Sequence, residues 1–168
     1  DNNIAIGFEA MNNVNEDGSN NNICIGYQAA TGGTNTMASC VVIGANAMNS
    51  TGNSNTQTGT IAIGHDALTA LTSGDSNTVI GYQAANGLTT GSSNTVVGYG
   101  AMDGAMGTNS EDSSANTAIG QGAMGGTWAN QQLDDCVCVG QGAMAGALDN
   151  VDGTVAVGYA SLTALTSG

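Results

Sequence analysis

The sequence predicts an all-β fold, a parallel β-solenoid (β-roll) of nine coils, and three observations carry this prediction. First, one short phrase recurs nine times in the 168 residues: an aliphatic tripeptide, a glycine, two variable residues, a small residue, and then Leu, Met or Ala. Second, successive copies lie 17–22 residues apart, which is typical of stacked solenoid coils. Third, most of the large apolar side chains fall inside the phrase. We therefore expect residues 1–168 to form a single repeat domain shaped as a rod.

The composition favours this rod over both a compact domain and a disordered chain. The chain has 27 Gly, no Pro, 4% aromatic residues and 8% charged residues, so it lacks the large side chains of an ordinary core. Sequences rich in Gly, Ser, Asn and Thr are often disordered. A disordered tract would not keep Ile or Val in register with Gly nine times, however, and the solenoid is therefore preferred.

Each aliphatic tripeptide is predicted to be a short strand, because β-branched residues bounded by Asn and Gly are a strand signal. In chain order the predicted strands are 4–6, 23–25, 41–43, 61–63, 78–80, 95–97, 117–119, 137–139 and 155–157. The glycine that follows each strand is expected at a corner, where it supplies a φ that a Cβ would forbid or leaves room for the turn. These glycines are Gly7, Gly26, Gly44, Gly64, Gly81, Gly98, Gly120, Gly140 and Gly158.

Side chains alternate along a strand, so each tripeptide contributes to two ladders that face opposite ways. We expect the residue before each glycine, always Ile or Val, to lie in the core: Ile6, Ile25, Ile43, Ile63, Ile80, Val97, Ile119, Val139 and Val157. The small middle residue should face outward, in an assembly ladder that lets another chain approach closely. This ladder comprises Ala5, Cys24, Val42, Ala62, Val79, Val96, Ala118, Cys138 and Ala156. Four positions after the glycine, Met and Leu side chains are predicted to close the core from the opposite side: Met11, Met48, Leu68, Met102, Met124, Met144 and Leu162.

The energetics of a single coil favour self-association. Each coil buries about two or three large side chains, each worth about 1.5–3 kcal/mol. Ordering the backbone opposes folding by about 1–2 kcal/mol per residue. We therefore expect copies of the chain to associate, as a homotrimer or as a head-to-tail filament. Residues 162–168 repeat residues 68–74, and joining residue 168 to residue 1 would give a normal coil. On this basis we expect the chain to be one window of a longer array or a subunit that stacks head to tail.

The charge excludes two classes of partner. The chain has 13 acidic residues, one His and no Lys or Arg, which gives a net charge of −13. Nucleic-acid binding and docking on anionic lipid both rest on basic side chains, and no apolar run reaches the roughly 18 residues of a membrane helix. We expect neither nucleic-acid binding nor direct membrane insertion. The acidic residues lie in the connecting segments or just after the glycine, where they solvate the rod or bind divalent cations.

The sequence offers no catalytic constellation, and we expect no enzyme activity. Residues 120–125 match G-x-G-x-x-G after a predicted strand. The cognate segments at Gly98 and Gly140 show that these glycines belong to the repeat, and no helix is predicted to follow them. His65 is the single histidine, and it occupies the slot after the glycine in which other repeats have Phe or Tyr. A ring that fills this slot is favoured over a catalytic base.

A calcium ion is the one cofactor left open by the sequence. Asn13, Asn15 and Asp17 imitate the start of a Ca²⁺ loop, but the distal Glu of that loop is missing at Cys24. These three residues are therefore a weak candidate site.

The cysteines Cys24, Cys40, Cys136 and Cys138 fit no zinc spacing. Cys24 and Cys138 replace Ala or Val in the small ladder, whereas Cys40 and Cys136 replace an Asn or Thr two residues earlier. They serve as small ladder residues, or Cys24 and Cys40 form a disulfide between neighbouring coils, or disulfides join separate chains.

The repeated phrase resembles the head repeats of trimeric autotransporter adhesins, as in residues 3–7 (Asn-Ile-Ala-Ile-Gly) and 116–120 (Asn-Thr-Ala-Ile-Gly). It is also similar to repeats of phage fibres and large bacterial surface proteins, as in residues 77–85 (Asn-Thr-Val-Ile-Gly-Tyr-Gln-Ala-Ala). The resemblance covers all nine repeats, although the coils here are longer than those of the adhesin heads. It implies a left-handed roll, three chains around one axis, and a location outside the cell, on the cell surface or on a virion fibre.

Repeats and resemblance together predict a non-enzymatic structural module of an extracellular fibre, filament or adhesin. The alternative is a module of a surface adhesin or phage tail fibre that binds a receptor or a glycan. Such a module would use the acidic loops and the insertion within residues 120–140, where Trp128 is the candidate recognition residue.

Overall fold

The chain folds as a parallel β-solenoid in which every repeated tripeptide is a strand, as predicted. The structure is a computed structural model that describes residues 2–14, 18–32, 36–50, 56–103, 112–126, 132–146 and 151–164. The main sheet contains, in spatial order, β1 (Ile4–Ile6), β2 (Ile23–Ile25), β4 (Val41–Ile43), β6 (Ile61–Ile63), β7 (Thr78–Ile80), β8 (Thr95–Val97), β9 (Thr117–Ile119), β10 (Val137–Val139) and β11 (Val155–Val157). All neighbours are parallel and in register, so each residue lies beside its counterpart in the next repeat.

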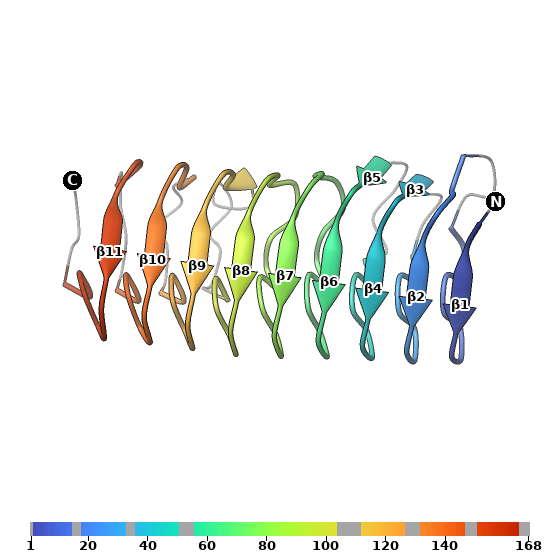
Figure 1. The fold of residues 1–168 in the computed structure, drawn as a ribbon, viewed down its shortest axis with the longest axis horizontal. Helices are drawn as coiled ribbons and strands as arrows, with labels where there is room; N and C mark the ends of the chain where they lie inside the picture. The colour runs from blue at the N-terminus through green and yellow to red at the C-terminus, as the bar shows by residue number, and fades with distance from the viewer. Residues whose placement is uncertain are drawn as a thin grey trace.

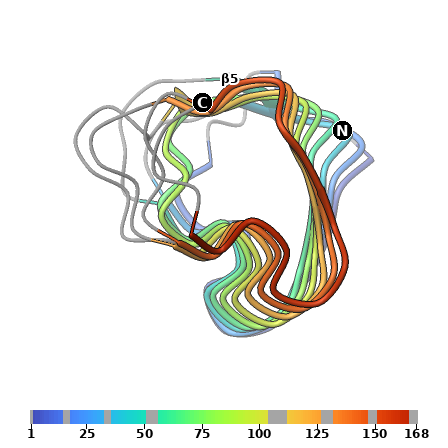
Figure 2. The ribbon, with the colours of Figure 1, turned by 90° about the vertical axis from the view of Figure 1, so that its left-hand side faces the viewer.

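The strands lie side by side along the long axis of the molecule, from β1 at one end to β11 at the other (Figure 1). Seen along that axis, the coils superpose, and the main sheet forms the straight side at the right of Figure 2. At about 4.8 Å per strand, this sheet is about 40 Å long. Nine strands enclose fewer than nine complete turns, so the predicted number of coils is slightly too high.

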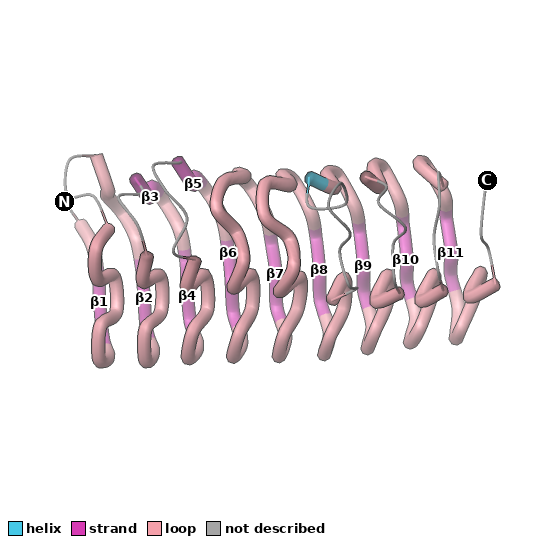
Figure 3. Tube along the Cα trace, turned by 180° about the vertical axis from the view of Figure 1, so that it is seen from behind, coloured by secondary structure: helices cyan, strands magenta, loops and turns pink. Residues whose placement is uncertain are grey.

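A second, two-stranded sheet lies in two of the connecting segments. Its strands, β3 (Thr36–Ala38) and β5 (Thr56–Thr58), are parallel, and each directly precedes a strand of the main sheet (Figure 3). Gln57 of β5 is buried, and its side-chain amide donates to the carbonyl of Thr72 over 2.9 Å. The repeated phrase does not extend to these segments, and the sequence therefore did not reveal this sheet.

The two faces of the main sheet are the reverse of the prediction. The small middle residues point into the coil, and all except Ala5 are at most 1% exposed: Cys24, Val42, Ala62, Val79, Val96, Ala118, Cys138 and Ala156. The residues before the glycines point outward instead, with Ile6 58% and Val157 67% exposed. The predicted assembly ladder is therefore part of the core of the solenoid, and it offers no outer surface to a second chain.

The narrow interior of the coil explains this reversal. Opposite each strand, the chain places a small residue three positions after the glycine, and in seven repeats a Met or Leu at the fourth position. Five of the predicted core-closing residues are buried, namely Met48, Leu68, Met102, Met124 and Met144, whereas Met11 and Leu162 in the end coils are partly exposed or exposed. Protein interiors pack at nearly crystalline density. The volume of these side chains therefore leaves room for only a small residue from the strand.

The turn after each strand has a fixed backbone pattern. Gly81 has a φ of +147°, and a Cβ there would overlap the carbonyl oxygen of Gly98 in the next coil, so both expected roles of the glycine are confirmed. Two left-handed residues follow at the second and fourth positions, as in Asp66 (φ 57°) and Leu68 (φ 52°). This conformation is unfavourable by about 1–2 kcal/mol for a residue with a Cβ. Hydrogen bonds between coils offset that energy, as where the Leu68 N–H donates to the carbonyl of Ala84 over 3.1 Å.

All four cysteines are free thiols in the interior. The backbone N–H of Cys40 donates to the side-chain carbonyl of Asn22 over 2.9 Å, and that of Cys136 donates in the same way to Asn116 over 3.0 Å. Both cysteines thus occupy the asparagine slot one coil further on. Burial raises the pKa of the Cys24 thiol to about 12, with a contribution from the charge of Cys40. These observations favour the interpretation of the cysteines as small ladder residues.

Candidate functional site

The outer face of the main sheet is apolar and uncharged over its whole length. The first and third residues of each strand point outward, and all eighteen are Ile, Val or Thr, none of them buried. The third-position column contains Ile6, Ile25, Ile43, Ile63, Ile80, Val97, Ile119, Val139 and Val157. The first-position column contains Ile4, Ile23, Val41, Ile61, Thr78, Thr95, Thr117, Val137 and Val155. Soluble monomers rarely expose a large contiguous apolar patch, so this face is a candidate interaction surface.

An aromatic ladder runs along the slot that follows the glycines. Phe8 and Tyr27 stack with ring centroids 5.5 Å apart and planes inclined by 12°. His65 stacks on Tyr82 at 5.3 Å, and Tyr82 stacks on Tyr99 at 5.5 Å. The interpretation of His65 as a ring in the aromatic slot is therefore confirmed. Offset stacking of this kind contributes about 0.5–1.5 kcal/mol per pair beyond the area buried.

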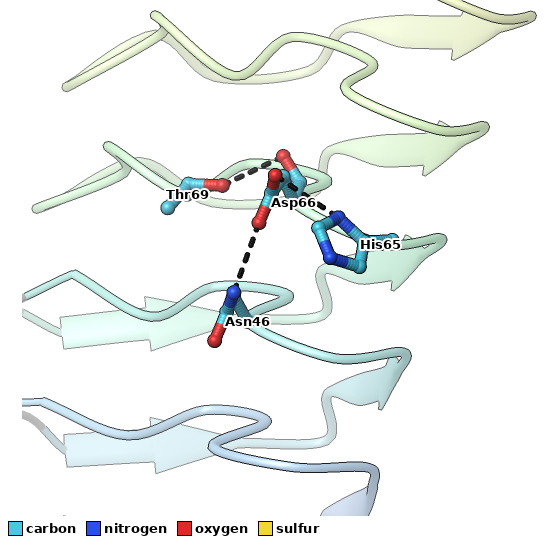
Figure 4. Close-up of polar contacts among 4 residues, drawn as sticks. All are labelled: Asn46, His65, Asp66 and Thr69. Carbon is cyan, nitrogen blue, oxygen red and sulfur yellow. Dashed lines mark hydrogen bonds and ion pairs between the residues drawn. The ribbon is translucent and has the colours of Figure 1, made fainter.

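A polar cluster centred on Asp66 lies beside this ladder (Figure 4). Its Oδ2 is 3.0 Å from Nδ1 of His65, and its Oδ1 accepts a hydrogen bond from Nδ2 of Asn46 over 3.1 Å. The backbone carbonyl of Asp66 accepts a hydrogen bond from the hydroxyl of Thr69 over 2.6 Å. The carboxylate thus fixes the orientation of the imidazole ring and joins two consecutive coils.

Asp66 also borders an open pocket of about 410 Å³, which is lined by Thr69, Ala70 and Asn86 as well. Asp66 is the only charged residue among these four lining residues. The pocket combines a carboxylate, a hydroxyl and an amide, which can hold a hydroxyl group or a cation.

Sequence reasoning missed the pairing of Asp66 with Asn46. The sequence did contain a signal, because Asn46 and Asp66 are both the second residue after their glycines. Glu9 and Gln28 occupy the same position in the first two repeats, and Nε2 of Gln28 donates a hydrogen bond to Oε2 of Glu9 over 2.6 Å. Two such pairs, Glu9–Gln28 and Asn46–Asp66, thus join consecutive coils, because the in-register stacking brings these positions together.

The other predicted site residues are only partly within the described ranges. Asn13 is exposed and has a left-handed φ of 61°, but Asn15 and Asp17 lie outside the described residues, as does Trp128. Within the described ranges no three His, Cys, Asp or Glu side chains are grouped so that they could hold a metal ion. The Ca²⁺ site and the recognition role of Trp128 remain predictions.

Comparisons with known proteins give no relative: no family model, no curated protein and no solved structure matches this chain. In the described part of the chain, no helix has the length and apolar character needed to cross a membrane.

Proposed function

We propose that this chain is a non-enzymatic structural module of an extracellular fibre, filament or adhesin, and that copies of it associate through the outer face of the main sheet. The observation that carries this proposal is the composition of that face. Eighteen outward positions contain no charged residue, although the chain as a whole has a net charge of −13. The repeated phrase adds support, because it resembles the head repeats of trimeric surface adhesins.

The physical properties of the outer face suit association with a second copy. Ile, Val and Thr have few side-chain rotamers, so burying them sacrifices little conformational freedom. Chains with a net charge of −13 repel one another. A contact between copies must therefore exclude acidic residues and bury apolar surface, and the outer face does both. Three chains around one axis, with their outer faces turned inward, would bury the eighteen side chains of each.

Charged substitutions on the outer face test this proposal. Ile80 and Ile119 are 38% and 39% exposed and are the fifth and seventh of the nine residues in the third-position column. We expect Ile80→Asp/Ile119→Asp to convert the assembly into monomers with an unchanged far-ultraviolet circular dichroism spectrum, measured by sedimentation velocity. Ser93→Asp is the matched control, because it adds a negative charge at an exposed turn position outside the outer face. An assembly that survives the double substitution would rule out this face as the interface.

A further inference from the structure

The aromatic ladder is interrupted at one coil. Backbone hydrogen bonds align this region: the Asn46 N–H donates to the carbonyl of Tyr27 over 2.9 Å, and the Asp66 N–H donates to the carbonyl of Ala45 over 3.0 Å. Tyr27, Ala45 and His65 therefore occupy the same slot in three consecutive coils. The middle one has a methyl group where its neighbours have rings, so one rung of the ladder is missing.

The missing rung has the dimensions of one flat group. Two strand spacings separate Tyr27 from His65, which places their rings about 10 Å apart. A planar group midway between them would lie at nearly the spacing of the existing ladder, where stacked centroids are 5.3–5.5 Å apart. Both walls are accessible: Tyr27 is 52% exposed and the side chain of His65 is 48% exposed. Tyr82, which has a ring on each side, is 45% exposed.

One wall of this gap is held in place by the polar cluster. Asp66 fixes the imidazole of His65 through the 3.0 Å contact, and Asn46 fixes Asp66 from the coil that also carries Ala45. The carboxylate of Asp66 has further lone pairs, and its side chain is 23% exposed. A negative charge therefore lies beside the imidazole ring that forms this wall, and Figure 4 shows the contact between Asp66 and His65.

We propose that the gap between Tyr27 and His65 binds the guanidinium group of an arginine from a partner protein, with Asp66 as its counter-ion. A guanidinium is planar, stacks on aromatic faces and donates several hydrogen bonds to a carboxylate. An ammonium group has no flat face with which to stack between two rings. The net charge of −13 attracts a cation in preference to a neutral or anionic group. None of the 168 residues is Arg or Lys, so a second copy of them cannot supply this group. The site is thus independent of the proposed self-association.

Titration with short peptides tests the chemistry of the site. The probes are acetyl-Gly-Arg-Gly-amide and its citrulline analogue, in which a neutral urea of the same shape replaces the guanidinium. We expect saturable binding of the arginine peptide, measured by nuclear magnetic resonance shifts, and about tenfold weaker binding of the citrulline peptide. Equal binding of the two peptides would overturn the proposal, because the affinity would then depend on the shape of the group and not on its charge. Absence of binding at millimolar arginine peptide would overturn it as well.

Two variants locate the site. Ala45→Tyr completes the ladder and should abolish binding of the arginine peptide while preserving the fold, because this slot accepts tyrosine in other coils. Gln141→Tyr is the matched control: it adds a tyrosine to the same slot four coils from the nearer wall, His65, and should leave binding unchanged. Asp66→Asn should weaken binding about tenfold by removing the charge. Undiminished binding to folded Ala45→Tyr would place the arginine elsewhere and contradict the proposal.

Discussion

Nδ2 of Asn94 donates a hydrogen bond to Oδ1 of Asn77, its counterpart one coil earlier, over 3.1 Å. Oδ1 of Asn94 in turn accepts hydrogen bonds from the backbone N–H and the side-chain amide of Asn116, at 3.0 and 3.2 Å. The three side chains are at most 1% exposed. Each buried amide thus depends on the coils on both sides, and this ladder couples neighbouring coils along the rod.

Removal of one ladder residue should destabilise the fold well beyond the loss of a single hydrogen bond. Asn94→Ala removes the acceptor of the Asn116 backbone N–H and one of the two donors to Oδ1 of Asn77, and an unsatisfied buried group costs about 1–3 kcal/mol. We expect the free energy of unfolding to fall by about 2–4 kcal/mol, measured by urea denaturation. Asn12→Ala, at an exposed position, is the control and should change it by less than about 0.5 kcal/mol.

The corner glycines should tolerate substitution much less than the glycines in the turn. In Gly81→Ala the new Cβ meets the backbone of Gly98, and φ is unfavourable, so we expect a loss of about 3 kcal/mol or more in the free energy of unfolding. Gly122 has a φ of +61°, and nothing lies within 4 Å of the position that a Cβ would occupy. Gly122→Ala should therefore lose only about 1 kcal/mol. Thermal unfolding of both variants measures the difference, and equal melting temperatures would contradict the close stacking of coils at Gly81.

The strands could be predicted from the sequence because each repeat marks its strand with a β-branched tripeptide and ends it with a glycine. The direction in which the side chains point could not. In a three-residue strand such as Ile61–Ile63, alternation allows either face to be buried, and size alone favours the two Ile residues inside. The deciding information was the buried volume opposite the strand, supplied by residues such as Ala123 and Met124. That volume can be assigned to a face only when the path of the turn is known.

The buried thiols should make stability depend on pH in the alkaline range. Burial raises the pKa values of Cys24 and Cys138 to about 12 from the ordinary 9.0, so the folded chain retains protons that the unfolded chain releases. This stabilisation is complete below pH 9 and is lost as the pH rises toward 12. Cys24→Ala/Cys138→Ala places the alanine of other coils in these slots, and its free energy of unfolding should fall less steeply above about pH 9. If the free energies of unfolding of the variant and of the unmodified chain fell equally with pH, burial would not be protecting the thiols from ionisation.

A half-buried carboxylate should oppose folding at neutral pH. Burial raises the pKa of Asp103, so the protonated carboxyl group favours the folded state. This stabilisation is fully present below pH 3.8, the ordinary pKa, and is lost as the pH rises through the raised pKa of the folded state. We expect Asp103→Asn to raise the melting temperature at about pH 7 and to leave it nearly unchanged at about pH 3. Asp135→Asn, which removes a carboxylate at an exposed position, serves as the control. A lower melting temperature of Asp103→Asn at neutral pH would contradict this account.

The candidate site was accessible to sequence reasoning only in part. The ring of His65 could be placed because the slot after the glycine contains Phe or Tyr in five other repeats. The contact between Asp66 and Asn46 depends on the register of coils that are 20 residues apart, and it became visible only in the fold. The outer face, too, could be predicted only in part. Its residues can all be identified in the sequence, but alternation and size place the third-position residues, such as Ile80 and Ile119, in the core.

The solution mass of the unmodified chain over a range of concentrations tests the central claim most directly. Light scattering after size exclusion should give a discrete mass of three times that of one chain, which stays constant as the protein is diluted through the micromolar range. A monodisperse monomer at every concentration, with the circular dichroism of a folded β protein, would contradict association through the outer face.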